Sequence, residues 1–369
     1  MLEQQDPNIY SNIEAMLDGL KSMDALDLEE INTYLDTFEK YECWHPFFHL
    51  MKHKISQAQS DPTEDYIRMA RAQGFYLEDI ESASKTCCEL VEQTEIGFSR
   101  FLQEIIPQII EKDNYIFEAM IFEMIGSRFK AVEDHVSCLE RLCMLYEKKI
   151  YDESRLAASY ERLLQVDPKN IKALRYFKLV YTQNQDWESV AESLQELMKS
   201  VSRKQEKFRV AQELAAVLLY QLDQPKDSIE VLKTCCKDSP LSSTTIEFDA
   251  YYRMRDWQSC LDILLDKLQE ETFDEARAMC LFNIAKLYLQ LKDSKLALEY
   301  FEKSADTKDE FLDPIEQIIN IKLEQNDWKG IVFWLEELKK KSTDGAHIER
   351  IEQAVQRIDG GIKDDSNQL

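Results

Sequence analysis

Three of the chain's five histidines stand together in the stretch CWHPFFHLMKH, residues 43–53. Pro46 favours a helix start there, because a proline ring presets φ and its missing N–H is not needed in a first helical turn. On such a helix His49 and His53 lie one turn apart on one face, with His45 just before it, and imidazoles at that spacing can share a transition metal ion. Because an acidic third ligand is not obvious nearby, surface histidines are the competing interpretation. We expect no cofactor, and keep these three residues only as a candidate metal site.

The residue patterns of covalent catalysis are missing from the sequence. No serine is flanked by glycines as in a nucleophile elbow. The 70 Asp and Glu residues produce many carboxylate pairs by chance, so none can be chosen as a general acid and base. The nine cysteines are scattered without metal-binding spacing, which predicts reduced and mostly buried thiols. We therefore expect a protein that is not an enzyme.

Charge and composition narrow the partners and the fold. With 45 Lys and Arg against 70 Asp and Glu, the formal net charge of −25 repels phosphate backbones and anionic lipid, so we expect neither nucleic acid nor a membrane as partner. The first residues lack the pattern of a signal peptide, and no apolar run approaches the roughly 20 residues that span a bilayer. We expect a cytoplasmic protein. No glycine occurs between Gly126 and Gly330, which disfavours tight strand turns and phosphate loops and favours helix throughout.

An Asp-Trp pair recurs at positions 186–187, 256–257 and 327–328. At the first, apolar residues recur at steps of three and four residues before the pair and again after it, which predicts two helices joined by a short turn. The aspartate stands where a helix N-cap belongs, its carboxylate accepting from backbone N–H groups that have no partner in the helix. We expect the tryptophan to begin the second helix and to pack against the end of the first.

A second similarity between two stretches of the chain shows that the repeating unit is half as long as the spacing of the Asp-Trp pairs. The stretch LLYQLDQPKDSIEVL at 218–232 aligns with LYLQLKDSKLALEYF at 287–301, between the Asp-Trp hairpins. The chain therefore repeats a helix hairpin of about 35 residues, and such hairpins bury their faces only by stacking on their neighbours. The expected fold is all-α, a right-handed α-solenoid of stacked antiparallel helix pairs with an additional N-terminal helical region.

These repeats resemble the tetratricopeptide (TPR) family over roughly residues 137–341. In the unit 278–311, six positions of the family pattern are filled by Leu281, Ile284, Ala285, Tyr288, Ala297 and Phe301. The unit departs from the pattern with Ser304 at the late alanine and Asp309 at the proline. The unit 209–242 keeps Ala216, Ser228, Leu232 and Pro240. No unit carries every signature residue, so the repeats are degenerate.

The expected organisation has three parts: an N-terminal helical region at 1–130, a TPR-like array at 131–341, and a capping helix with a disordered tail at 342–369. The first part is either a bundle or a set of divergent repeats. Within it, YIFEAMIFEMI at 115–125 is apolar on nearly every side of a helix. Such a helix is either buried or covered by a partner, and we prefer burial.

The resemblance implies a scaffold or adaptor that binds a segment of a partner protein in the concave groove lined by first helices. The mixed character of this groove predicts a segment with basic and apolar residues. Family members that hold a C-terminal carboxylate use Lys, Asn and Arg at inward positions, and here such residues fall in units too far apart to meet. The expected groove residues are Lys172, Arg175, Tyr176, Glu213, Tyr220, Asp249, Tyr252, Asn283, Lys286 and Asn320.

Two alternatives stay open. Some bacterial regulators join N-terminal helices to a tetratricopeptide array and bind or dephosphorylate a response regulator, and the length and division of this chain fit them. A metal-binding protein is the second alternative, on the histidine cluster alone. The sequence names neither the partner nor the oligomeric state.

Overall fold

The computed structural model describes residues 8–58, 61–236, 244–342 and 344–366, and those residues form helices and connecting turns without a strand. This confirms the all-α fold class. The chain divides into two compact units, Met1–Val180 and Tyr181–Leu369. Helices on the two sides of residue 130 pack against each other, and the three-part organisation expected from the sequence stays a prediction.

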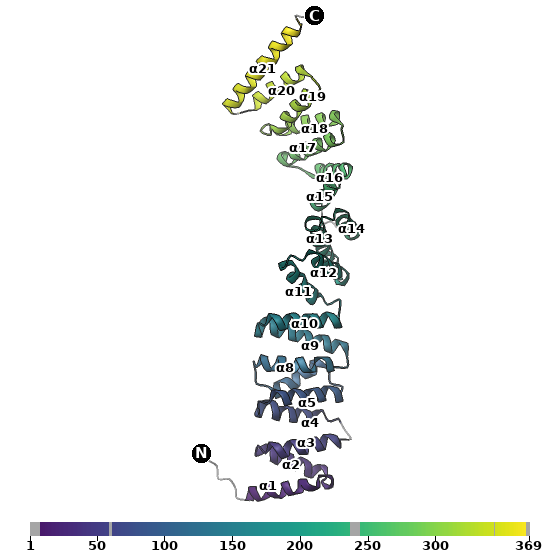
Figure 1. Ribbon diagram of the computed structural model, residues 1–369, viewed down its shortest axis with the longest axis vertical. Helices are drawn as coiled ribbons and strands as arrows, with labels where there is room; N and C mark the ends of the chain where they lie inside the picture. The colour runs from purple at the N-terminus through teal and green to yellow at the C-terminus, as the bar shows by residue number, and fades with distance from the viewer. Residues whose placement is uncertain (1–7, 59–60, 237–243, 343, 367–369) are drawn as a thin grey trace. The chain divides into compact units, whose positions relative to one another are not determined.

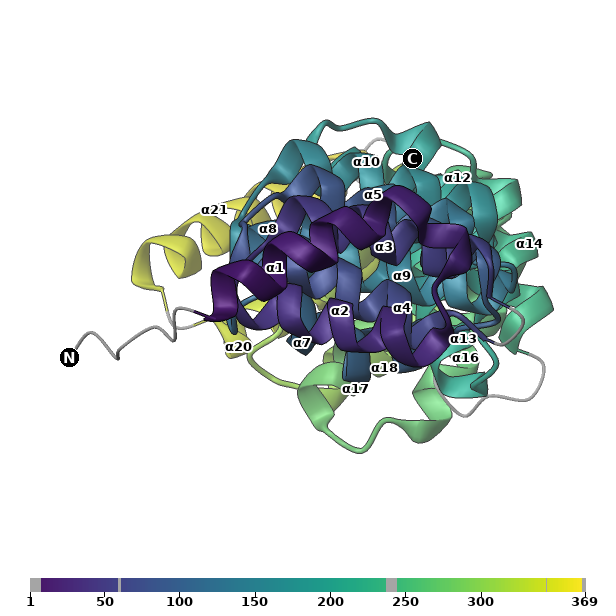
Figure 2. The same ribbon diagram turned by 90° about the horizontal axis from the view of Figure 1, so that it is seen from below.

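The unit Met1–Val180 stacks four helix hairpins behind a leading helix. Figure 1 shows its helices lying one above another, and Figure 2 looks onto the end covered by α1. The elements are α1 (Asn8–Gly19) with the 3-10 turn η1 (Leu20–Ala25); α2 (Leu28–Lys40) and α3 (Trp44–Ser56); α4 (Thr63–Arg71) with the π-helical turn η2 (Ala72–Tyr76), and α5 (Ile80–Gln93); α6 (Phe98–Arg100), the π-helical turn η3 (Phe101–Ile105), α7 (Ile106–Ile109), α8 (Tyr115–Ile125) and η4 (Gly126–Arg128); α9 (Val132–Leu145), the π-helical turn η5 (Tyr146–Ile150) and α10 (Glu153–Val166).

The unit Tyr181–Leu369 continues the same hairpin pattern. α11 (Ile171–Gln183) begins before the division and ends inside this unit, followed by α12 (Trp187–Ser200), α13 (Lys204–Tyr220), α14 (Pro225–Cys236), α15 (Thr244–Arg253), α16 (Trp257–Glu270), α17 (Asp274–Gln290), α18 (Ser294–Thr307), α19 (Asp313–Glu324), α20 (Trp328–Lys341) and α21 (Gly345–Ser366). From α12 to α21 each helix packs on the next along the chain. The last helix runs to Ser366, into the expected tail, and residues 367–369 of that tail lie outside the described residues.

The Asp-Trp pairs cap second helices as the sequence predicted. The Asp256 carboxylate accepts from the backbone N–H of Ser259 at 3.3 Å, and the residue before it, Arg255, has a left-handed φ of 58°. A left-handed residue followed by a capping Asp or Asn recurs at separations of about 35 residues, and of twice that between Gln185 and Arg255. These left-handed residues are Glu78, Asp113, Tyr151, Gln185, Arg255, Lys292 and Asn326. Hairpins of the same type therefore reach into the N-terminal third.

The third hairpin corrects one expectation. Its first arm ends at Ile109, and Asn114 caps α8 by accepting from the Phe117 N–H at 3.2 Å. The preferred burial of the whole apolar stretch 115–125 is wrong. Ile116, Met120 and Met124 are 62, 39 and 39% exposed, because α8 packs one side on its neighbours and presents these positions, one turn apart, to solvent.

Small residues mark where helices approach closely, and serine replaces alanine at two of these places. Ser228 and Ser304 are fully buried, and their hydroxyls donate to the backbone carbonyls of Ala215 at 2.9 Å and Ala278 at 2.7 Å. A buried hydroxyl needs such an acceptor, and a helix carbonyl has a lone pair to spare. The serine that departs from the family pattern in the unit 278–311 thus packs as alanine would and adds a hydrogen bond.

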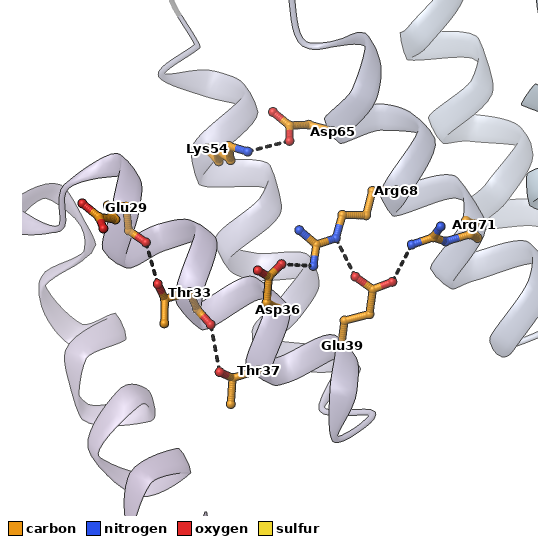
Figure 3. A network of polar contacts seen from close by, with 9 residues as sticks. All are labelled: Glu29, Thr33, Asp36, Thr37, Glu39, Lys54, Asp65, Arg68 and Arg71. Atoms are coloured by element: carbon orange, nitrogen blue, oxygen red, sulfur yellow. Dashed lines mark hydrogen bonds and ion pairs between the residues drawn. The ribbon is translucent and has the colours of Figure 1, made fainter.

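A cluster of ion pairs joins the first two hairpins (Figure 3). The Glu39 carboxylate on α2 accepts from Arg68 at 2.5 Å and from Arg71 at 2.7 Å, both on α4. Lys54 on α3 pairs with Asp65 on α4 at 2.7 Å. These groups are mostly shielded from water, which strengthens their attraction over that of surface pairs. Three helices of the two hairpins are thereby held in register.

Candidate partner-binding groove

A hollow of about 400 Å³ opens among α15, α16 and α17 in the unit Tyr181–Leu369. It lies where two consecutive first helices, α15 and α17, flank the second helix α16 between them. One part of its lining is apolar and another carries amines, amides and hydroxyls. The lining residues are Thr244, Thr245, Phe248, Tyr252, Ile263, Leu264, Lys267, Asn283, Lys286, Leu287 and Gln290.

Tyr252 is an exposed aromatic ring held in place by its neighbours. Its ring lies nearly parallel to that of Phe248, with centroids 6.1 Å apart, and meets Trp257 edge-on at 5.2 Å. Trp257 packs in turn against a buried apolar cluster that includes Cys260 and Ile284. A 52% exposed ring with a fixed orientation offers apolar area at little entropic cost on binding. The Asp-Trp motif therefore also supports this wall of the hollow.

The polar part of the lining is cationic. Lys267 on α16 and Lys286 on α17 are both exposed, and neither forms an ion pair within the part of the chain that the structure describes. The Lys286 ammonium lies 5.5 Å from the Phe282 ring centroid. Asn283, half-buried beside them, supplies an amide that can donate or accept. Two ammonium groups without an ion pair among the described residues give this hollow a locally positive character in a chain of net charge −25.

Tyr220 and Asp249 bind each other instead of lining the hollow. The Tyr220 hydroxyl donates to the Asp249 carboxylate at 2.5 Å, which ties α13 to α15. Arg253 covers the Tyr220 ring at 5.6 Å and pairs with Asp223 at 2.9 Å. Burial, and then the hydrogen bond to Asp249, raises the pKa of Tyr220 to about 12, so the hydroxyl stays protonated near neutral pH. This contact makes Tyr220 a structural residue, while a role in binding stays a prediction.

The remaining groove residues lie apart from the hollow. Lys172 pairs with Glu140 at 2.7 Å, and the Tyr176 ring stacks on Tyr160 with centroids 4.5 Å apart. Both pairs lie, with the exposed Arg175, in the other unit. Glu213 and Asn320 are exposed on α13 and α19, outside the lining. Of the ten predicted groove residues the structure brings together three at the hollow, Tyr252, Asn283 and Lys286.

Lys267 and Gln290 line the hollow but were not predicted. The repeat pattern indicates groove residues only at inward positions of first helices, whereas Lys267 belongs to the second helix α16. Gln290 is the last residue of α17, beyond the inward positions that the family pattern indicates. No local signal distinguishes either from the many other polar residues of the chain.

The three histidines at 45, 49 and 53 do not come together as a group of metal ligands among the described residues. His45 and His49 are exposed on α3 and His53 is half-buried. Across the described residues, no three His, Cys, Asp or Glu side chains lie close enough together to hold a metal ion. The expectation of a shared metal on this helix therefore finds no geometric support, because the third ligand is not brought in by the fold.

No protein-family model matches the chain, and no curated protein matches it either. Among solved structures, it is similar to YrrB, a TPR protein with an unusual peptide-binding site, at 15% identity over 61% of this chain and 98% of that one, with a TM-score of 0.33. It is also similar to yeast Tom70 at 10% identity, covering 96% of this chain and 94% of that one, with a TM-score of 0.32. At these identities and TM-scores the similarities say nothing about what this chain binds.

The fold itself defines the class of protein. Antiparallel helix pairs of about 35 residues, capped at the same position and packed each on the next, make this chain a TPR-like helical-repeat protein. Among its described residues no helix is both long and apolar enough to cross a membrane.

Proposed function

We propose that this protein is a non-catalytic interaction scaffold that binds a segment of a partner protein in the hollow between α15 and α17. The single observation that supports this most is the joint presence of a rigid exposed aromatic ring, Tyr252, and two unpaired ammonium groups around about 400 Å³. Aromatic anchors in such pockets dominate peptide affinity, and the charges set orientation and encounter rate.

The chemistry of the hollow supports binding over catalysis. Its lining contains no His, Cys, Asp or Glu side chain, the groups that most often transfer protons near neutral pH. Elsewhere in this unit, burial raises the pKa of the Cys260 thiol to about 11, and burial also raises that of Cys280. Thiols with raised pKa values stay protonated and are poor nucleophiles.

The lysines revise the expected partner at this hollow. The sequence predicted a segment with basic and apolar residues, but Lys267 and Lys286 would repel a basic group placed between them. An extended segment with an apolar side chain against Tyr252 and Leu287, and an acidic side chain within reach of the lysines, matches the lining better. The partner we propose here is therefore an acidic and apolar segment of another protein.

Site-specific photo-crosslinking tests this proposal. A photoreactive phenylalanine analogue is placed at Gln290, which lines the hollow, and in a second version of the full chain at Phe333, which is 58% exposed on α20 and outside the lining. Crosslinked proteins from the native cell are identified by mass spectrometry. We expect a partner crosslinked from position 290 and not from position 333.

The same crosslink is then measured in Tyr252→Ala and Lys286→Ala, with Phe273→Ala as a matched control because that ring is 75% exposed and outside the lining. Removing a hot-spot ring should lower affinity at least about tenfold. A partner that binds Tyr252→Ala and Lys286→Ala as tightly as the unchanged chain would refute the assignment of this hollow.

A further inference from the structure

Exposed aromatic side chains gather at one edge of the unit Met1–Val180. Phe75, Tyr76 and Leu77 end the first arm of the second hairpin and are 46, 51 and 42% exposed. The Tyr76 ring stacks on Trp44 of the first hairpin with centroids 5.3 Å apart, and Trp44 stacks on Phe48 at 6.4 Å. We call Trp44, Phe48, Phe75 and Tyr76 the aromatic edge. Several large rings side by side and partly in water are a recurrent mark of an interaction surface.

The backbone forces these rings outward. The helix widens into the π-helical turn η2, in which the Leu77 N–H donates to the Ala72 carbonyl at 3.2 Å. The Asp79 N–H donates a hydrogen bond to the Gln73 carbonyl at 2.9 Å and so closes the turn. Inside the turn Gly74 lies against the backbone of Ile109, so the turn cannot rotate inward. The exposure of the next three residues is thus a property of the fold, since π-helical turns change the face that the following side chains occupy.

A small hollow of about 130 Å³ adjoins the aromatic edge and is bordered by carboxylates. Its lining includes the exposed Phe75, the buried Phe117, and the carboxylates of Glu78 and Glu111. Neither glutamate forms an ion pair within the described ranges, and both are exposed. Lys112 directly follows Glu111 in the sequence. A cation at such a place is attracted in two ways, by the charge of the unpaired carboxylates and by the quadrupole of the neighbouring aromatic rings.

We propose that the aromatic edge binds a basic segment of a partner protein, with an arginine or lysine of that segment over the face of the Tyr76 ring that Trp44 does not cover, and within reach of Glu78. An arginine fits best, because its planar guanidinium stacks on aromatic rings and can donate to a carboxylate at the same time. The net charge of −25 favours a cationic occupant over an acidic segment, an anionic membrane or a second copy of this chain. This surface is independent of the hollow at Tyr252, which belongs to the other unit and favours an acidic segment.

Fluorescence anisotropy with labelled peptides tests the proposal on the full chain. The probes are the hexapeptide RLRRLR and its charge variants KLKKLK and ELEELE, at physiological salt. We expect RLRRLR to bind tightest, KLKKLK more weakly because an ammonium does not stack as a guanidinium does, and ELEELE not measurably. Failure of RLRRLR to bind, or equal binding of ELEELE, would overturn the proposal.

Two matched pairs of variants separate the aromatic edge from general attraction to an acidic protein. Tyr76→Ala should weaken RLRRLR about fivefold to tenfold, while Phe273→Ala, which removes another exposed ring, should change it less than about twofold. Glu78→Gln should weaken it further than Glu302→Gln, which removes the same charge from an exposed site on α18. Equal effects within both pairs would show non-specific attraction and refute the site. The glutamate pair keeps the test decisive if Tyr76→Ala unfolds.

Discussion

Replacing Gly74 with alanine tests how closely the second and third hairpins pack. A Cβ at this position would lie 2.5 Å from the Ile109 carbonyl oxygen and 2.8 Å from its Cγ2 atom. The nearest atom is backbone, so it cannot rotate away as the end of a long side chain could. Gly126 is a matched control in the same unit, because it is also buried and helical, and its Cβ would meet only the Cys138 sulfur at 3.5 Å.

The two substitutions should change the free energy of unfolding in opposite directions. Alanine in place of a helical glycine gains about 1 kcal/mol, since glycine loses more backbone entropy on folding. At Gly126 that gain should appear nearly in full. At Gly74 the overlap of about 1 Å adds an overpacking cost of about 1–3 kcal/mol. We take the upper half of that range, because the atom nearest to the added Cβ is the backbone oxygen of Ile109, which cannot rotate away. The net loss at Gly74 is then about 1–2 kcal/mol.

Hydrogen exchange with mass spectrometry of the full chain measures the change in stability separately for each part of the chain. This local measurement is needed because stacked repeats need not unfold in one step. Peptides from 63–125 should exchange about 5–30 times faster in Gly74→Ala than in the unchanged chain, if they exchange through opening of this region. They should exchange no faster in Gly126→Ala. A Gly74→Ala chain as stable as the unchanged one would refute the close contact between η2 and α7.

Two further predictions concern capping and pH. Asp256→Ala should lower the free energy of unfolding of the unit Tyr181–Leu369 by about 1 kcal/mol, and Asp262→Ala, in the middle of the same helix, by much less; urea unfolding followed by circular dichroism compares them, and equal losses would contradict a capping role. Burial, and then the hydrogen bond to Glu123, raises the pKa of Tyr146 from 10.0 to about 12. Because the folded pKa is the higher one, this stabilisation is complete below pH 10 and is lost as the pH rises from 10 to about 12. The midpoint temperature of thermal unfolding should fall more steeply with pH across that range in the unchanged chain than in Tyr146→Phe. Identical slopes would rule the effect out.

The regular part of the fold follows from local signals. A capping aspartate, the helical spacing of apolar residues and small residues at fixed positions each act within one hairpin, and the sequence therefore predicted the hairpins between Asp186 and Lys341. The N-terminal hairpins lack the Asp-Trp pair and a clear period in the sequence. Their shared feature, a left-handed residue before the cap such as Glu78, is a backbone conformation that no residue type announces.

The candidate sites depended on contacts between hairpins. The sequence named Tyr252, Asn283 and Lys286, because inward positions of first helices follow from the repeat. It could not name Lys267, since the side of a second helix that borders the hollow is set by how three helices cross.

The sequence by itself determined that this chain is helical, repetitive, acidic and built of hairpins, because propensity, capping and periodicity operate over a few residues. Only the tertiary structure decided which side chains meet water. The π-helical turn carries Tyr76 outward, the packing of α8 leaves Met120 exposed, and the approach of α13 to α15 joins Tyr220 to Asp249. Each of these results depends on the direction in which one helix crosses another, and that direction is settled by packing across the whole hairpin rather than by neighbouring residues.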